Sequence, residues 1–551
     1  MKNIFSLIFI MALLSLSVNS FSQKKVKLVH ADVQKGGKGY TKWVGDVIFS
    51  HEDTRIRCDS AIRFDKTNLI EAYGHIRINE GDSIQITSKK LIYEGDKKIA
   101  RLRDNVVFHK LNEVTLYTDF LDYDRSRQLA YYYNNGKLVD STNTLTSNKG
   151  YYQTSNNMAS FKTNVVGVNP DYKMETDTMQ YNVKTNIVYF RAHTRLTDKE
   201  GKIFNHENGQ YDTNQKRSNF SKGFLETESY DLTGDKLYLD DIRKYYRANK
   251  NVFLLAKDDN IIISGDVGEF WSDQQLTKIY GNAMLRKITD TDTLFLTADT
   301  LVSIDSEYDS AKRLLAYKNV KLFKKDFQGK SDSLSYFLSD STIFFYQDPV
   351  LWTEENQLTA DSINIVISNN NIDRLNMSIK SFVISQDTVL NFNQIKGRKM
   401  TAYFKESNIE KILVNGNGES IYFALEDEDN SLIGMNKILC SDMKIKFHDN
   451  KVKNILFYKK PEGKLIPPQE LEEPDKRLQG FSWRYNDRPV REDMVLRQIF
   501  PENVYDNQPA SENEKQKAND LLIEKRLDKK GEIDNKKSLN KPKGRVKKPI
   551  N

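Results

Sequence analysis

A short phrase that recurs about every 30 residues constrains this chain more than any single residue does. It reads Asp-x-apolar-x-aromatic, then a polar turn, then a second segment that often contains Asn-Val-x-apolar. Copies of the two halves include residues 119–123, 177–181 and 332–336, and residues 104–108, 250–254 and 318–322. A fixed period between about 20 and 50 residues indicates stacked units that share one continuous core. The repeat therefore points to a long scaffold and away from a compact enzyme.

Apolar and polar residues alternate with period two inside each copy, which is typical of strands. In residues 115–123, for example, Asp119, Leu121 and Tyr123 share one face. The recurrent Asp predicts a structural hydrogen bond to a turn amide and not a catalytic array. We therefore expect an all-β fold with one buried and one polar face. The pattern leaves open whether the buried face closes into a dry core or stays open as a groove.

The positive charge of the chain is concentrated at its end. The 83 Lys and Arg residues exceed the 76 Asp and Glu residues by seven, and residues 535–551 hold seven basic residues and no acid. The remaining chain balances to zero, so it has no net attraction for nucleic acid. We expect no nucleic-acid partner and a disordered basic tail over residues 501–551.

Residues 1–22 are predicted to be a signal peptide. Lys2 precedes an apolar stretch over residues 4–16, and Ser20 and Ser22 stand where small residues precede a cleavage site. The two cysteines, Cys58 and Cys440, lie far apart in a linear array and are predicted to be buried free thiols. Export with so few cysteines favours the periplasm.

Catalytic and metal-binding patterns are not found. None of the seven histidines pairs with a Cys or His at metal-ligand spacing. No nucleophile and base arrangement and no pair of groove carboxylates stands out. The sequence thus predicts no enzyme activity, no catalytic residues, no metal and no cofactor.

The recurring Asp-x-Leu-x-Tyr strand, followed by Gly/Asn-x-Val and preceded by an export signal, resembles the OstA-like family over about residues 40–458. Residues 478–483 look like the ending of long OstA-like proteins of the Bacteroidetes type. The family comprises the periplasmic bridge protein of lipopolysaccharide transport and the periplasmic N-terminal domain of the outer-membrane translocon. The resemblance implies an elongated open β-jelly-roll (β-taco) of stacked V-bent antiparallel strands, with an apolar trough for the acyl chains of lipid A.

This resemblance also implies a division of the chain. We expect three OstA-like β-jelly-rolls at residues 23–170, 171–325 and 326–460. A Pro- and aromatic-rich C-terminal cap over the last repeat is expected at residues 461–500, before the tail. The family's bridge protein has one such domain, and no long outer-membrane barrel follows here.

The candidate trough residues are the same-face apolar pairs of the repeat: Leu91 and Tyr93, Val106 and Phe108, Leu121 and Tyr123, Met179 and Tyr181, Leu237 and Leu239, Val252 and Leu254, Val320 and Leu322, Leu334 and Tyr336. The alternative is that they fill a closed sandwich core.

The resemblance implies a periplasmic function in lipopolysaccharide transport that contributes to outer-membrane assembly. The implied partners are lipopolysaccharide, an inner-membrane exporter and an outer-membrane translocon, joined through edge strands, with end-to-end self-association and possible association with the outer membrane. The alternative function is a structural or adhesion β-repeat protein without lipid cargo.

Overall fold

The computed structural model describes residues 25–495 apart from residues 65, 229, 258–259, 289–291, 307, 369–370, 406–407, 427 and 449–450. The chain divides into the units Met1–Val490 and Arg491–Asn551, and the described residues of the second form one short helix, α2 (Arg491–Val495). The predicted signal peptide and basic tail lie outside the described residues. Within the described part of the chain, no helix is long and apolar enough to span a membrane.

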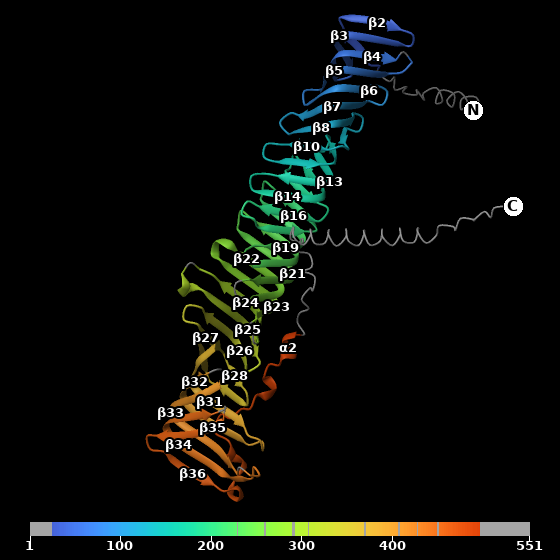
Figure 1. Cartoon of the computed structure of the whole chain (residues 1–551). Coiled ribbons are helices and arrows are strands. Elements are labelled where there is room, and N and C mark those ends of the chain that lie inside the picture. The colour runs from blue at the N-terminus through green and yellow to red at the C-terminus, as the bar shows by residue number, and fades with distance from the viewer. Residues whose placement is uncertain are drawn as a thin grey trace, which may run out of the picture. The chain divides into compact units, whose positions relative to one another are not determined.

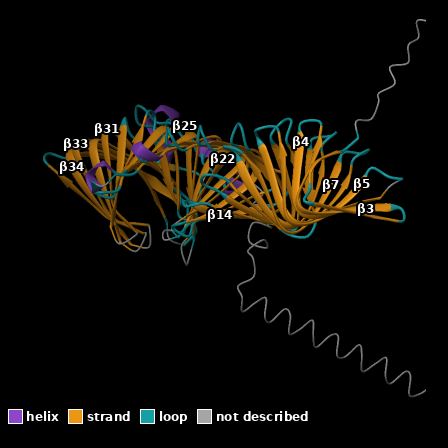
Figure 2. Ribbon diagram, turned by 90° about the horizontal axis from the view of Figure 1, so that it is seen from above, coloured by secondary structure: helices purple, strands orange, loops and turns teal. Residues whose placement is uncertain are grey.

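In its described residues the first unit forms 36 strands, all joined by antiparallel pairing into one sheet (Figure 1). They follow one another in chain order, and Figure 2 shows loops and a few short helical turns between them. The strands up to residue 182 are β1 (Lys27–His30), β2 (Val33–Gly37), β3 (Tyr40–His51), β4 (Thr54–Phe64), β5 (Leu69–Glu80), β6 (Ile84–Glu94), β7 (Ile99–Lys110), β8 (Val114–Asp124), β9 (Leu129–Tyr132), β10 (Gly136–Val139), β11 (Thr144–Ser147), β12 (Lys149–Gln153), β13 (Met158–Val168) and β14 (Tyr172–Asn182).

The remaining strands are β15 (Ile187–Phe190), β16 (Thr194–Asp198), β17 (Ile203–His206), β18 (Asn208–Asp212), β19 (Arg217–Glu226), β20 (Tyr230–Asp240), β21 (Tyr245–Ala256), β22 (Ile261–Trp271), β23 (Leu276–Ile288), β24 (Thr293–Ile304), β25 (Arg313–Lys324), β26 (Phe327–Phe337), β27 (Thr342–Tyr346), β28 (Val350–Thr353), β29 (Asn356–Thr359), β30 (Ser362–Ser368), β31 (Asn371–Gln386), β32 (Phe392–Lys405), β33 (Asn408–Leu425), β34 (Leu432–His448), β35 (Lys451–Tyr458) and β36 (Glu462–Ile466). The 3₁₀ turns are η1 (Ser272–Gln274), η2 (Asp309–Ala311), η3 (Pro468–Glu470), η4 (Glu473–Lys476) and η5 (Tyr485–Asp487).

Each long strand bends at its middle. The register between β3 and β4 shifts between Val44 and Val47, and equivalent shifts separate the two halves of the neighbouring pairs. We call the side that holds residues 40–44 of β3 arm A and the side that holds residues 47–51 arm B. Some bent strands are interrupted at this corner and carry two labels, as β9 in arm A and β10 in arm B do. The predicted all-β stack of V-bent antiparallel strands is confirmed.

Residues with positive φ make the corner on alternate strands. Asp104 and Asn105 have φ of 64° and 53°, Lys250 and Asn251 have 61° and 49°, and Lys318 and Asn319 have 62° and 54°. This is the Asn of the repeated Asn-Val phrase, and Asn tolerates the left-handed region better than most residues. The repeated sequence phrase therefore encodes the bend itself.

The recurrent Asp supports the corner from the adjacent strand. Asp119 accepts a hydrogen bond of 3.1 Å from the backbone N–H of Asn105, and Asp299 accepts bonds of 3.0 and 3.1 Å from the side-chain amide of Asn319. Asp442 likewise accepts a bond of 3.0 Å from the N–H of Gly416. The predicted structural role of the Asp, a hydrogen bond at a turn amide, is confirmed.

A substitution at Lys250 tests the corner. Lys250 is exposed and has φ of 61°, so a β-branched side chain would be strained there. We expect Lys250→Val to lower the free energy of unfolding by about 1–2 kcal/mol, because a β-branched side chain adds strain in the left-handed region to the cost that the unbranched Lys already bears. Lys250→Gly is the matched control and should stay within about 1 kcal/mol of wild type. Urea unfolding measures both, and equal stability of the two variants would contradict this account of the corner.

The interior of the V holds the core. One apolar cluster runs from Val26 to Val252 and a second from Ile279 to Ile445. Val383 on β31 belongs to the interior, whereas its neighbour Ile384 points to the other side of the sheet and belongs to a third cluster. The predicted boundaries at residues 170/171 and 325/326 both fall in turns between paired strands, and the three-part division stays a prediction.

Residues 467–490, which we call the strap, cover this third cluster on the outer face of arm B. Leu478, Phe481 and Trp483 pack there, and Phe392 lies 5.3 Å from the Phe481 ring and 5.2 Å from that of Trp483. The segment predicted as a cap over the last repeat thus extends back over several repeats, and Arg488 donates to Gln328 on β26.

Two buried glutamines hold the strap in the same way. Gln394 donates to the carbonyl of Lys476 and accepts from the N–H of Leu478, each at 2.8 Å. Gln357 donates to the carbonyl of Ser482 at 2.7 Å and accepts from the N–H of Arg484 at 2.6 Å. Each side-chain amide therefore pairs with residues n and n+2 of the strap, as an adjacent strand would.

Loss of one of these amides should release the strap. Gln394→Leu leaves the Leu478 N–H and the Lys476 carbonyl without their partner, which costs about 1–3 kcal/mol for each buried group. We expect faster trypsin cleavage after Lys476 and Arg477 in this variant. The matched control is Gln210→Leu, at an exposed position on β18. Equal cleavage rates in the two variants would show that the amide does not hold the strap.

Candidate functional site

The structure places the candidate trough residues on the inner faces of both arms. Those from the first half of the repeat, such as Leu121 and Tyr123, lie in arm A, and those from the second half, such as Val106 and Phe108, lie in arm B. Most are buried and belong to the two interior clusters; Leu239, Leu254 and Tyr336 are half-buried. The repeat therefore brings its two apolar halves face to face.

The interior is packed where these residues meet. The rings of Phe108 and Tyr123 lie 6.0 Å apart in an edge-to-face arrangement, and Phe108 has the same relation to Tyr152 at 6.0 Å. Phe108 belongs to arm B, whereas both tyrosines belong to arm A. Such pairs stabilise packing beyond the area they bury, by about 0.5–1.5 kcal/mol. An apolar guest could occupy this place only if the arms moved apart.

Polar side chains join the free ends of the arms, opposite the corner. His51 Nδ1 at the end of β3 in arm B lies 2.6 Å from Tyr93 Oη at the end of β6 in arm A. Arg125, in the turn after β8 of arm A, donates to Asp53 at 2.6 Å and to Tyr93 at 3.3 Å. Lys98 of arm A donates to Glu52 of arm B at 2.8 Å.

Two further bridges extend this row. Tyr152 of arm A donates to Glu113 of arm B at 3.0 Å, and Tyr181 of arm A donates to Asp140 of arm B at 2.9 Å. Lys110 of arm B also contacts Asn157 of arm A. We call these bridges, together with those of His51, Arg125 and Lys98, the mouth clasp. Apart from the bond between Arg125 and Asp53, which spans about five strands, each links a strand end in arm B to one about three strands further along in arm A.

The centre of the clasp is buried and its edge is not. The Arg125 side chain is 5% exposed, whereas those of Lys98 and Glu52 are 35% and 28% exposed. Burial raises the pKa of Tyr93, and the pKa of Glu52 is lowered by its hydrogen bond from Lys98. Hydrogen bonds of this kind contribute about 0.5–1.5 kcal/mol each, and an exposed ion pair contributes less. The clasp thus closes the mouth through several modest contacts.

One buried histidine lies among aromatic rings. His206 on β17 is buried, with the Phe220 ring 4.2 Å and the Phe190 ring 4.7 Å away. Neither ring nitrogen has a hydrogen-bond partner among the described residues. Burial, with a smaller effect of His193, lowers the pKa of His206 to about 3. This histidine is a neutral part of the core.

Two further groups bear on the chemistry of the chain. Cys58 is a buried free thiol, and burial raises its pKa to about 12, which makes it unreactive. Cys440 is also free but half-buried, so the prediction of two buried thiols is wrong for Cys440.

Among the described residues, no three His, Cys, Asp or Glu side chains gather as a metal site would require.

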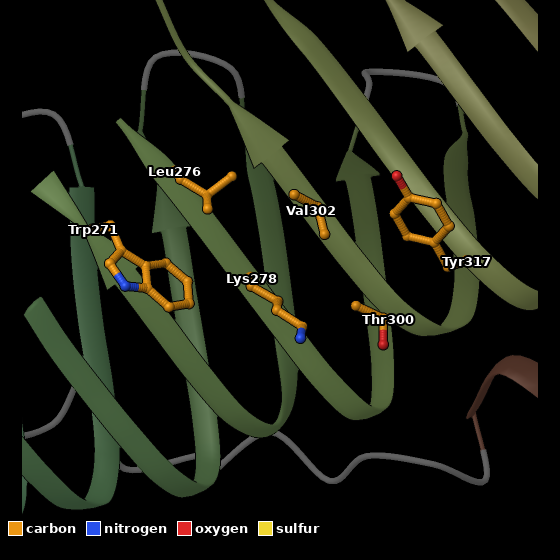
Figure 3. Close-up of a pocket in the computed structure, with 6 residues that line it drawn as sticks. All are labelled: Trp271, Leu276, Lys278, Thr300, Val302 and Tyr317. Atoms are coloured by element: carbon orange, nitrogen blue, oxygen red, sulfur yellow. The ribbon is translucent and has the colours of Figure 1, made fainter. Parts of the chain in front are cut away.

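A shallow depression of about 480 Å³ lies on the outer face of arm A (Figure 3). Trp271, Leu276, Lys278, Thr300, Val302 and Tyr317 line it, from strands β22 to β25. Their chain neighbours Ile279 and Leu301 belong to the interior cluster, so the depression faces away from the core. It contains none of the candidate trough residues and is separate from the mouth clasp.

The comparisons with known proteins give one family match, which lies in the N-terminal part. Residues 23–177 match the family model of the OstA-like proteins. The OstA-like resemblance is confirmed for this range. Among solved structures, the chain is similar to LptH from Pseudomonas aeruginosa, described as the LptA homologous periplasmic component of the conserved lipopolysaccharide transport device. The match has a TM-score of 0.19 and 12% identity, and it covers 21% of this chain and 82% of that chain. No curated protein matches the chain.

Sequence reasoning did not identify the mouth clasp, the strap glutamines or the outer depression. Residues 124–126 read as an ordinary polar turn, although they contain Arg125. The tyrosines at the ends of the repeat were assigned to the apolar lining, and Tyr93 and Tyr181 also use their hydroxyls to bridge the arms. The aromatic residue that ends the repeated phrase is therefore the one sequence feature that could have indicated bridges between the arms.

The buried His206 should make stability depend on pH. Because its pKa is about 3 in the folded protein and near 6.5 unfolded, the unfolded chain binds the proton more readily, and stability falls as pH drops below about 6.5. We expect His206→Phe to remove about 2 kcal/mol of the stability difference between pH 7 and pH 5. Urea unfolding at both pH values measures this, with the exposed His75→Asn as control. An unchanged pH dependence in His206→Phe would contradict the assignment.

Proposed function

We propose that this protein is a periplasmic lipopolysaccharide-transport protein that shields lipid A acyl chains between the two membranes and so contributes to outer-membrane assembly. The observation that carries the proposal is the apolar inner face, which recurs in register from β3 to β34 on both arms. Each methylene kept from water contributes about 0.8 kcal/mol, so an apolar interior lowers the cost of carrying long acyl chains. The OstA-like match over residues 23–177 supports this function, and no enzyme activity is part of it.

The ends of the stack suit partners that add a strand. β1 and β2 both pair with β3, and β35 and β36 both pair with β34, so each end of the described sheet has a free strand edge. Exposed edges pair readily with strands of other chains. We propose that the exporter, the translocon or a second copy of this chain joins there.

A second function is favoured by one observation. The interior is packed, and Phe108 of arm B contacts Tyr123 of arm A. A permanently closed core would make this chain a structural or adhesion β-repeat protein without lipid cargo.

Photo-crosslinking separates the two functions. A photoreactive residue replaces Leu121, which is buried inside the V, and in a matched variant it replaces Tyr151, which is 41% exposed on the outer face of arm A. Both proteins are incubated with purified lipopolysaccharide, irradiated and measured by mass spectrometry. We expect a lipid adduct at Leu121 and at most a tenth as much at Tyr151, about the ratio that a free-energy preference of 1.4 kcal/mol produces.

Adducts of equal yield at both positions would indicate nonspecific surface binding. An intact, folded Leu121 variant without any lipid adduct would overturn the transport proposal and leave the closed-core function.

A further inference from the structure

We propose that the mouth clasp is a lateral gate, which must open before an amphiphile can place its acyl chains inside the N-terminal part of the V. This inference rests on the proposed function and names the route by which cargo reaches the interior. It concerns the bridges of the clasp from His51 to Asp140, of which only Tyr93 and Tyr181 also belong to the candidate trough residues.

The connections between the arms differ at the two sides of the V. At the corner, each strand passes from one arm to the other through its own backbone. The ladder hydrogen bonds of β3 to β8 run between neighbouring strands within the same arm, on either side of the register shift. At the mouth, the bridges of the clasp are made by side chains. The arms can therefore part at the mouth without loss of any ladder hydrogen bond.

The clasp lies directly over the packed interior. Tyr93 and Tyr181 have buried rings among the candidate trough residues and hydroxyls in the bridges to His51 and Asp140. A guest that separates Phe108 from Tyr123 must also separate the strand ends above them. Opening the clasp and filling the interior are thus one structural change.

The polarity of the mouth suits an amphiphile. When the arms part, the charged ends of Arg125, Lys98, Glu52 and Asp53 reach solvent at the rim, while the apolar inner faces stay covered by acyl chains. Partly exposed charges such as Lys98 and Glu52 already border solvent in the closed form. The polar head of the guest would remain outside at this rim, and only its chains would enter.

A covalent bridge across the mouth tests the gate. Glu52 of arm B and Lys98 of arm A, which contact each other, are both changed to Cys in a chain with Cys58→Ala and Cys440→Ser, and a cleavable bis-maleimide joins them. The control joins Lys97→Cys and Arg127→Cys, both highly exposed and in adjacent turns of arm A. Lipopolysaccharide is the probe, and the photoreactive residue at position 121 reports loading.

We expect the bridge across the mouth to reduce loading at position 121 at least about tenfold, and cleavage of the linker to restore it. The bridge within arm A should leave loading unchanged. If the protein bridged across the mouth loads as well as the control, the gate is wrong while the transport function stands. If the unbridged protein does not load either, the proposed function fails and the gate fails with it.

A second pair of variants weakens the clasp without new cysteines. Tyr152→Phe and Tyr181→Phe each remove one hydroxyl that reaches the opposite arm and keep the ring. We expect each to speed lipid loading about threefold, because one bridging hydrogen bond is lost from the closed form. The control is Tyr151→Phe on the outer face. Loading that is unchanged or slower in both clasp variants would overturn the gate even if the bridged proteins fold poorly.

Discussion

The corner in the middle of each strand is the constraint on which the other features depend. Two consecutive residues with positive φ, such as Lys318 and Asn319, redirect the strand, and an Asp on the adjacent strand accepts hydrogen bonds there. Without the bend, one face of the sheet would have no partner to bury it. With it, the inner faces of arms A and B cover each other, and the strand ends meet at the mouth. The core and the clasp are both consequences of a backbone geometry that Asn and Asp accommodate.

Much of this fold could be predicted from the sequence because its determinants are local. The Asn-Val phrase marks the corner, and the period-two alternation places Leu121 and Tyr123 on the inner face. Both signals act within a few residues of the chain, where side-chain direction follows from the strand itself. The repetition strengthens the prediction of the fold, because each copy of the phrase indicates the same bend. The fold class and the buried positions were therefore accessible without tertiary information.

The contacts between arms were not accessible in this way. His51 meets Tyr93 across the V about three strands further along, an offset that depends on how neighbouring strands twist. Arg125 reads as part of a polar turn, and its burial against Asp53 appears only when both turns are placed. Gln357 and Gln394 look like solvent-facing strand residues, yet the strap buries them. A period-two pattern distinguishes the two faces of a strand but does not say what covers the outer one.

The strap makes the two parts of the sheet mechanically different. Around β28 and β29 the sheet is buried on both faces, because Leu351 and Leu358 face the interior while Trp352 and Gln357 face the strap side. Arm B is braced there by hydrogen bonds from the Gln357 and Gln394 side chains to the backbone of the strap, so bending it away would break contacts on its outer side as well as in the core. In strands β3 to β14 arm B has no such brace among the described residues, and side-chain bridges join its ends to arm A. Separation of the arms is consequently easiest in the N-terminal part, where the interior aromatic contacts and the clasp would part together.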